Sequence, residues 1–472
     1  MVTKSKQYFF CGIGGSGMLP LALTVRALGH EVAGSDRALD QGRSGEKFDF
    51  LRSKGIGLFA QDGSGLTDPR QILIASAAIE DTVPDVAAAI SLGAIRMTRA
   101  ELLASLFNQA DRSIAIGGTS GKSTTTAMIG WIYAHAERNP TIVNGAVMKN
   151  FVNEDVLFAS AVAGDPGQFI CEVDESDGSI ALFHPKISVL NNISLDHKSM
   201  DELRTLFKDF VDKAECAVIN LDNDESEKIA AMLKGKARTY SLEKSHAEFF
   251  ATDITSHKMG ISFKVAHEGG APTPVNLKMP GRHNVSNALA AIATAFEGGI
   301  PLEEACRALD HFTGVKRRFE FVGDTNDIVV IDDFGHNPDK ISATFSTLND
   351  FPGRLLVMFQ PHGFGPLRKM KPEFIQCFAA HLSDQDHLLM PQPVYFGGTV
   401  DRSVTSDDIV EELHAKGLNA KAYASRKECG DHLLELAAPG DRVVIMGARD
   451  DTLSEFAEEI LHRLQDKFAR QN

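Results

Sequence analysis

The sequence predicts an α/β protein of three domains, each built on a largely parallel, doubly wound sheet. Its 472 residues exceed what one compact core usually accommodates. Three segments each open with a strand-like apolar run and continue as alternating strands and helices, which favours parallel sheets. The predicted domains are 1–109, 110–319 and 320–472. Within the second, residues 235–280 lack helical periodicity and predict a β-rich insertion.

The first segment begins with a strand-like run and a glycine-rich turn. Gly12, Gly14 and Gly17 have the spacing G-x-G-x-x-G, and residues 18–28 follow with the apolar spacing of a helix. Asp36 follows the second predicted strand, at the distance where an acid that binds a ribose is expected. A Rossmann-like turn of this kind cradles a pyrophosphate, so NAD and a uridine diphosphate sugar both remain open. The alternative is a turn that only packs a helix on a strand.

The second segment contains the most informative motif, GGTSGKSTTT at residues 117–126. Backbone N–H groups of such a turn wrap a phosphate at a helix N-terminus. Lys122 can reach the outer phosphates, and the hydroxyl of Ser123 can hold a magnesium ion. Ile116 stands where the strict motif has glycine, but the strand before the turn and the helix after it keep the context of a P-loop. The motif predicts nucleoside triphosphate binding, against the alternative of an ordinary glycine turn.

Two further buried strands of the second segment end in polar residues. Glu172 opens the run EVDESD after one strand, and His197 follows the other. The carboxyl ends of parallel strands meet at one edge of a sheet, where the phosphate turn also lies, so these side chains should converge there. Carboxylate oxygen and imidazole nitrogen beside Ser123 suit a metal site shared with phosphates. A solvated, helix-capping acidic run is the alternative.

Further polar residues mark the end of the second segment and the third. Asn284 and Asn287 can share one face of a helix, where they either contact an adenine or cap the helix. An arginine of the run Lys316, Arg317 and Arg318, near the predicted hinge, could reach a transferring phosphate, or the run could be a solvated basic patch. His336 and His362 each follow a strand, and each fits a structural role as well as a catalytic one.

The composition excludes several classes of protein. A net charge of −15 argues against a nucleic-acid-binding protein, which needs a basic surface. The sequence has no apolar run long enough to cross a membrane. Six scattered cysteines without CxxC pairs fit a reducing cytoplasm and argue against structural zinc.

The ordered motifs GIGGSGM, GTSGKSTTT, CEVDESD, NNISLDH, GRHNVSNA, RRFEF, DDFGHNP and QPH resemble those of the Mur ligases of bacterial cell-wall synthesis. The resemblance runs through all three predicted domains and is greatest to the members that join UDP-N-acetylmuramate to L-alanine. It implies a first domain that binds the UDP-sugar, a middle domain that binds ATP with Mg²⁺ or Mn²⁺, and a third that binds the amino acid. It also implies a cytoplasmic monomer or homodimer.

The resemblance implies a role for each matching residue. The UDP-sugar site is expected to comprise Gly12, Gly14, Gly15, Ser16, Gly17, Asp36 and Ser76. The ATP site is expected to comprise Gly118, Thr119, Ser120, Gly121, Lys122, Ser123, Thr124, His283, Asn284, Asn287 and Asp333. The expected metal ligands are Ser123, Glu172 and His197, and the expected catalytic residues are Lys122, Glu172, His197, Arg318 and His336. His362 is expected beside the amino acid.

The implied reaction activates the carboxylate of the sugar nucleotide as an acyl phosphate, which the amine of the amino acid then attacks. L-Alanine is the amino acid that the resemblance implies by default. The amino acid site departs from the family pattern, because the segment that usually reads QPHRxTR here has Gly363 and Pro366 in place of its arginines. Arg368 or Lys369 is therefore expected to bind the amino acid carboxylate. The alternatives are a ligase that attaches the tripeptide L-Ala-D-Glu-diaminopimelate, an NAD-dependent oxidoreductase and a non-catalytic nucleotide-binding protein.

Overall fold

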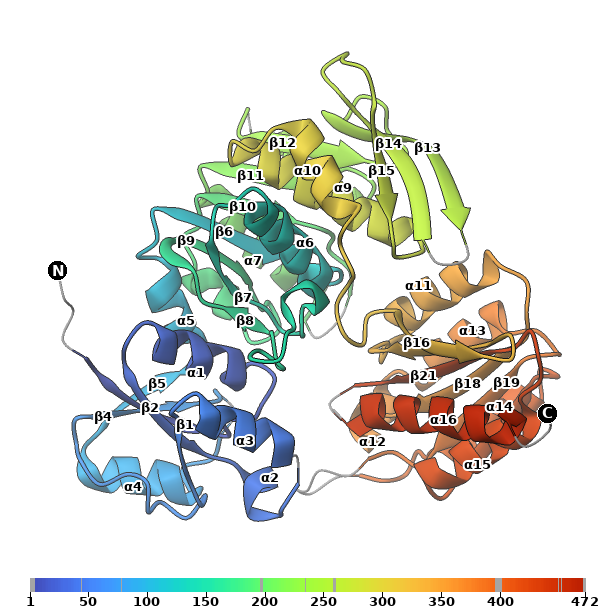
Figure 1. Cartoon of the computed structure of the whole chain (residues 1–472), viewed down its shortest axis with the longest axis horizontal. Helices are drawn as coiled ribbons and strands as arrows, with labels where there is room; N and C mark the ends of the chain where they lie inside the picture. Colours follow the sequence, from blue (N-terminus) through green and yellow to red (C-terminus); the bar gives the residue numbers. More distant parts are fainter. Residues whose placement is uncertain are drawn as a thin grey trace. The chain divides into compact units, whose positions relative to one another are not determined.

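The computed structural model divides the chain into two compact units. It describes residues 5–43, 45–77, 79–195, 198–233, 235–257, 260–394, 401–448, 450 and 452–469. One unit comprises Met1–Thr255, Ile261–Lys278 and His283–Val315, and the other comprises Ser256–Gly260, Met279–Arg282 and Lys316–Asn472. The first unit contains two sheets and the second contains one (Figure 1). This confirms the predicted α/β fold of three largely parallel sheets.

The first sheet has the strand order β3-β2-β1-β4-β5, and all of its pairs are parallel. Its strands are β1 Gln7–Cys11, β2 Glu31–Ser35, β3 Gly57–Phe59, β4 Gln71–Ala75 and β5 Ile95–Thr98. Its helices are α1 Met18–Ala27, α2 Arg37–Asp40, α3 Gly45–Ser53, α4 Pro84–Leu92 and α5 Arg99–Phe107. The strand order reverses between β1 and β4, which is where open α/β sheets bind ligands. The glycine turn at 12–17 joins β1 to α1 at this point.

The second sheet has ten strands in the order β15-β14-β13-β12-β11-β10-β6-β9-β7-β8. They are β6 Arg112–Gly117, β7 Pro140–Val143, β8 Ala161–Val162, β9 Asp165–Glu172, β10 Ile187–Leu190, β11 Cys216–Asn220, β12 Ala237–Ser241, β13 Phe249–His257, β14 Gly260–His267 and β15 Thr273–Leu277. The helices are α6 Lys122–His135, α7 Met200–Asp212, α8 Asp224–Met232, α9 Arg282–Glu297 and α10 Leu302–Leu309, with short 3₁₀ turns η1 Lys149–Phe151 and η2 Ser179–Leu182. The predicted β-rich stretch is confirmed, and it extends this sheet through β12 to β15 (Figure 1).

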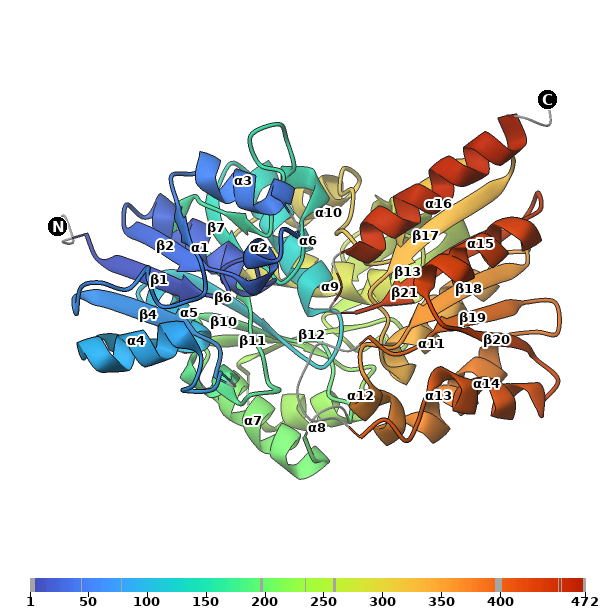
Figure 2. The same ribbon diagram turned by 90° about the horizontal axis from the view of Figure 1, so that it is seen from below.

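The third sheet has the order β16-β17-β21-β18-β19-β20. Its strands are β16 Glu320–Thr325, β17 Ile328–Asp333, β18 Leu355–Gln360, β19 His387–Pro391, β20 Asn419–Tyr423 and β21 Arg442–Gly447. Its helices are α11 Pro338–Asn349, α12 Phe364–Lys369, α13 Lys371–His381, α14 Ser406–His414, α15 Arg426–Leu436 and α16 Thr452–Ala469. Helices α11 to α14 cover one face, and α15 and α16 cover the other (Figure 2). The edge strand β16, which the sequence analysis did not predict, is antiparallel to β17.

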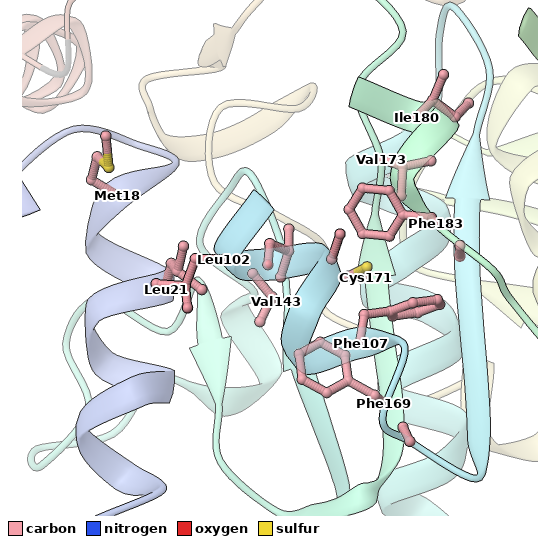
Figure 3. Close-up of a cluster of buried hydrophobic side chains, with 14 of the residues drawn as sticks. Met18, Leu21, Leu102, Phe107, Val143, Phe169, Cys171, Val173, Ile180 and Phe183 are labelled. Carbon is pink, nitrogen blue, oxygen red and sulfur yellow. The ribbon is translucent and has the colours of Figure 1, made fainter. Parts of the chain in front are cut away.

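The first two sheets share one hydrophobic core. Phe107, at the end of α5, is fully buried, and its ring meets the rings of Phe169 and Phe183 at centroid distances of 5.8 and 5.4 Å (Figure 3). Edge-to-face aromatic pairs of this kind add to the free energy of burial. The shared core explains why the predicted first and second domains form one compact unit, and it holds α5 against the end of β9. The predicted domain boundaries themselves stay a prediction.

Among the described residues, no helix combines the length and the apolar character that a membrane span requires.

Candidate functional site

The first glycine turn is held in shape by Asp36. One oxygen of this carboxylate accepts a hydrogen bond from the backbone N–H of Gly14 at 2.8 Å, and the other accepts one from Ala38 at 2.8 Å as the N-cap of α2. Ser16 and Ser76 are exposed beyond the carboxyl ends of β1 and β4. The structure therefore brings the predicted sugar-nucleotide residues to one edge of the first sheet. Asp36 fixes the conformation of the glycine turn through its hydrogen bond with Gly14.

The phosphate turn joins β6 to α6 and requires glycine. Gly121 precedes α6 with a φ of +83°, and a Cβ there would lie 2.5 Å from Oδ1 of Asn287. Asn192 supports the outer part of the turn, because its backbone carbonyl accepts from Thr119 N–H at 3.1 Å and its Oδ1 accepts from Ser120 N–H at 2.8 Å. The turn thus has a fixed shape at the N-terminus of a buried helix, as a phosphate-binding loop requires.

Lys122 forms a partly buried ion pair with Glu175. The lysine Nζ donates to Glu175 Oε2 at 2.8 Å and to the carbonyl of Gly118 at 2.7 Å. The Glu175 side chain is only 5% exposed, so its charge depends on this lysine for compensation. The ammonium group has three N–H donors, so one remains for a phosphate beside these two partners. Sequence reasoning did not single out Glu175, although it belongs to the EVDESD run that drew attention to Glu172.

Ser123 and Glu172 lie together, as predicted. The Ser123 hydroxyl donates to Glu172 Oε2 at 2.7 Å, and Glu172 is the last residue of β9. Gly145 makes room for the carboxylate, since a Cβ on Gly145 would lie 1.9 Å from Glu172 Oε1. Two hard oxygen donors in a cradle next to the phosphate turn fit a magnesium ion. His197, the third predicted ligand, lies outside the described residues.

Asn284 and Asn287 are buried near the start of α9, beside the phosphate turn. The Asn287 Nδ2 donates to Asn284 Oδ1 at 3.3 Å, and Asn287 Oδ1 accepts from the Thr125 hydroxyl at 3.3 Å. Asn191 donates to the same hydroxyl at 3.0 Å and so links β10 to this polar network. His283 is half-buried one residue before Asn284. The structure thus gives both asparagines a role in fixing α9 to α6, and their predicted contact with adenine stays a prediction.

In the second unit, the predicted residues lie beyond the carboxyl ends of β17 and β18. The Asp333 carboxylate accepts hydrogen bonds from Phe319 N–H at 2.8 Å, Gly335 N–H at 2.8 Å and the Thr344 hydroxyl at 3.0 Å. It therefore organises the surrounding loops. The rings of His336 and His362 are nearly perpendicular, with centroids 5.1 Å apart. These two histidines therefore form a pair, although their strands β17 and β18 are separated in the sheet by β21.

Two arginines of the second unit have different surroundings. The guanidinium of Arg318 lies 4.7 Å from the ring centroid of Phe334, and Arg368 pairs with Asp401 on the surface. The aromatic contact orients Arg318 next to the His336 loop. The pairing of Arg368 shows that it can hold a carboxylate, and its predicted role toward the amino acid remains a prediction.

The imidazole of His336 is neutral at physiological pH. Burial lowers its pKa well below the usual value, and the nearby charge of Lys340 acts in the same direction. His336 Nδ1 lies 3.0 Å from the Phe334 carbonyl. A neutral imidazole can accept a proton, so this environment is compatible with the predicted role of a base.

The burial of His336 predicts a pH dependence of stability. The unfolded chain binds a proton on this imidazole near pH 6.5, while the folded chain does not, so acidification favours unfolding. Below pH 6.5 the free energy of unfolding of the wild type should fall as the pH falls. We expect this slope to be smaller in His336→Gln, by up to about 1.4 kcal/mol per pH unit. Urea denaturation between pH 5 and 7.5 measures this. His462→Gln, at an exposed histidine of the same unit, is the control, and equal slopes for both variants would contradict the prediction.

Comparison with known proteins decides the family. Three family models match the chain: Mur ligase family, catalytic domain, at residues 7–111; Mur ligase middle domain at 116–295; and Mur ligase, glutamate ligase domain, at 317–449. The chain belongs to the Mur ligase family. The predicted resemblance and the ligase class are thereby confirmed.

Full-length relatives give the same result. The chain is 34% identical to a UDP-N-acetylmuramate–L-alanine ligase of Geotalea uraniireducens, over 95% of this chain and 96% of the relative. It is 32% identical to the enzyme of the same name from Agathobacter rectalis, over 98% and 99% of the two chains.

Solved structures of Mur ligases share the fold. The UDP-N-acetylmuramate–alanine ligase of Thermotoga maritima superposes with a TM-score of 0.78 at 23% identity, covering 99% of this chain and 100% of that one. A murein peptide ligase of Psychrobacter arcticus superposes with a TM-score of 0.70 at 25% identity, covering 98% of each chain.

Proposed function

We propose that this Mur ligase joins UDP-N-acetylmuramate to L-alanine at the expense of ATP, in peptidoglycan precursor synthesis. The observation that carries the proposal is the set of groups at the carboxyl edge of the second sheet. There, Lys122 opens α6, and Ser123 pairs with Glu172 at 2.7 Å. The relatives at 32–34% identity that are named L-alanine ligases support the choice of substrates. The oxidoreductase, binding-protein and tripeptide alternatives are not favoured.

The chemistry requires two anions to meet. A carboxylate resists attack by an amine, whereas an acyl phosphate has phosphate as its leaving group. Lys122 would contact the phosphates and offset the repulsion between the γ-phosphate and the substrate carboxylate. A magnesium ion held by Ser123 and Glu172 would supply further positive charge to the phosphate oxygens.

The second unit would supply the amino acid and the proton acceptor. We assign Arg318 to the transferring phosphate and neutral His336 to the amine of the amino acid, since an ammonium group must lose a proton before it attacks. His362, whose ring lies next to that of His336, would hold the imidazole in place. Exclusion of water during this step protects the acyl phosphate from hydrolysis.

Phosphate release from ATP tests the proposal. The full chain is incubated with ATP, Mg²⁺ and UDP-N-acetylmuramate, and a panel of single amino acids and the L-Ala-D-Glu-diaminopimelate tripeptide is added one by one. We expect release that depends on both the sugar nucleotide and L-alanine. Release only with the tripeptide or another amino acid would reject the proposed substrate, and no release with any of them would reject the proposed activity.

Loss of the Glu172 carboxylate should weaken the metal site. We expect Glu172→Gln to raise the Mg²⁺ concentration at half-maximal phosphate release by about 10- to 100-fold, because an amide is a poorer ligand for a hard cation. Gly145→Ala should act in the same direction, since the added Cβ would displace Glu172. Asp177→Asn, at an exposed acid of the same run, is the matched control. An unchanged Mg²⁺ requirement in Glu172→Gln would contradict the assignment.

A further inference from the structure

A cavity of about 130 Å³ lies where α5 meets the carboxyl end of β9. Its charged lining comprises Arg99 from α5, Lys122 from the start of α6, Glu172 at the end of β9 and Asp174 just beyond it. Phe107 of α5 contacts Phe169 of β9 and Phe183, which follows η2, and these apolar contacts hold the walls of the cavity together (Figure 3). The cavity therefore connects a helix of the first sheet with the groups that surround the phosphate turn.

Arg99 also reaches the glycine turn of the first sheet. A Cβ on Gly17 would lie 2.9 Å from Cδ of Arg99 and 3.1 Å from its Nε, so the arginine side chain passes directly over this glycine. Gly17 immediately precedes α1, at the turn where a pyrophosphate is expected. Arg99 thus extends from the edge of the sugar-nucleotide turn into the cavity beside Lys122.

Most of the charged side chains around the cavity have hydrogen-bond or ion-pair partners within the protein. Lys122 is paired with Glu175, Glu172 accepts from Ser123, and Asp174 accepts from the backbone N–H of Ser176 at 2.9 Å. Within the part of the chain that the structure describes, Arg99 makes no hydrogen bond or close ion pair, although it is half-buried, and its charge interacts at longer range with the Asp174 carboxylate. A guanidinium in such a place is poised to pair with an anion from a ligand.

We propose that Arg99 binds the lactyl carboxylate of the sugar nucleotide and directs it toward the phosphate turn. This inference rests on the proposed function. The carboxylate must lie beside the γ-phosphate, and the cavity contains Lys122 and Glu172, which mark that position. A guanidinium group can donate two parallel hydrogen bonds to the two oxygens of a carboxylate. As one carboxylate oxygen bonds to the γ-phosphorus and the bond from that phosphorus to ADP breaks, Arg99 remains protonated and bound to the acyl group.

Binding measurements with two sugar nucleotides test this assignment without ATP or turnover. UDP-N-acetylmuramate carries the lactyl carboxylate, whereas UDP-N-acetylglucosamine lacks it. By titration calorimetry, we expect Arg99→Gln to bind UDP-N-acetylmuramate at least about 10-fold more weakly and UDP-N-acetylglucosamine within about 2-fold of wild type. Arg99→Lys should give an intermediate loss, since it keeps the charge but not the planar fork. Arg96→Gln, which removes an exposed pair with Asp81 nearby in the chain, is the matched control.

The outcomes separate this inference from the proposed function. Equal weakening of the binding of both ligands would place Arg99 on the pyrophosphate and overturn the carboxylate assignment. Unchanged binding of both ligands would also overturn the carboxylate assignment. Unaltered UDP-N-acetylglucosamine binding also shows that the variant is folded, and Arg99→Lys provides the test if Arg99→Gln does not fold. Failure of the wild-type chain to bind UDP-N-acetylmuramate would overturn the proposed function and this inference with it.

Discussion

Replacing Lys122 with alanine is expected to lower kcat/KM for L-alanine-dependent phosphate release by about 10³-fold, while leaving UDP-sugar affinity within about 2-fold. The lysine begins α6 at the phosphate turn, whereas the sugar-nucleotide turn lies at the edge of a different sheet. Steady-state kinetics and calorimetric titration with UDP-N-acetylmuramate measure the two effects. Loss of both together would argue against separate sites for the two substrates.

The same substitution should reduce stability, because it leaves Glu175 buried without its partner. We expect a loss of about 1–3 kcal/mol in the free energy of unfolding. The double variant Lys122→Met/Glu175→Gln removes both charges and should recover most of that loss without recovering activity. Recovery of activity in the double variant would show that Lys122 acts only by compensating Glu175.

Replacing Arg317 with methionine should give the largest loss of stability in the second unit, about 3–5 kcal/mol. Arg317 donates from Nε to Asp332 at 3.3 Å, from Nη1 to the Asp450 carbonyl at 3.0 Å and from Nη2 to the Gly447 carbonyl at 2.6 Å. Arg317 and Asp332 are 8% and 1% exposed, so the substitution leaves a buried carboxylate without a countercharge. Chemical denaturation at pH 8 measures the loss.

The pH dependence of the stability loss in Arg317→Met shows whether the buried charge of Asp332 causes it. Burial raises the pKa of Asp332 to about 6, and the charge of Arg317 opposes that rise. A carboxyl whose folded-state pKa is raised destabilises the fold as pH rises through that value, so removing Arg317 should cost more at pH 8 than at pH 5. The neighbouring Arg318→Met is the matched control, since Arg318 is half-buried and its aromatic contact with Phe334 contributes only about 1 kcal/mol. A loss that is independent of pH would argue against the buried charge as its cause.

Adjacent residues in these motifs show why sequence spacing could not assign every role. Arg317 and Arg318 are adjacent residues of the same type, and both guanidinium groups lie near the Phe334 ring. Only Arg317 is buried in an ion pair with Asp332, whereas Arg318 is half-buried. Glu172 and Glu175 belong to one acidic run, but the first meets Ser123 and the second meets Lys122. The direction of each side chain depends on backbone angles and on neighbours that are distant in the chain.

Local patterns by themselves determined the three α/β sheets, the two glycine turns and the placement of Glu172 at a strand end. These features depend on short-range chemistry: apolar strands, glycine where a Cβ would collide, and polar residues at strand ends. Strand β16 escaped prediction because it is a partly exposed edge strand with little apolar signal. Only the tertiary structure decided that α5 packs against β9, that Arg99 passes over Gly17 and that Asp36 supports the turn from behind. Such contacts join segments far apart in the chain, and their geometry follows from how whole sheets and helices pack together rather than from any local run of residues.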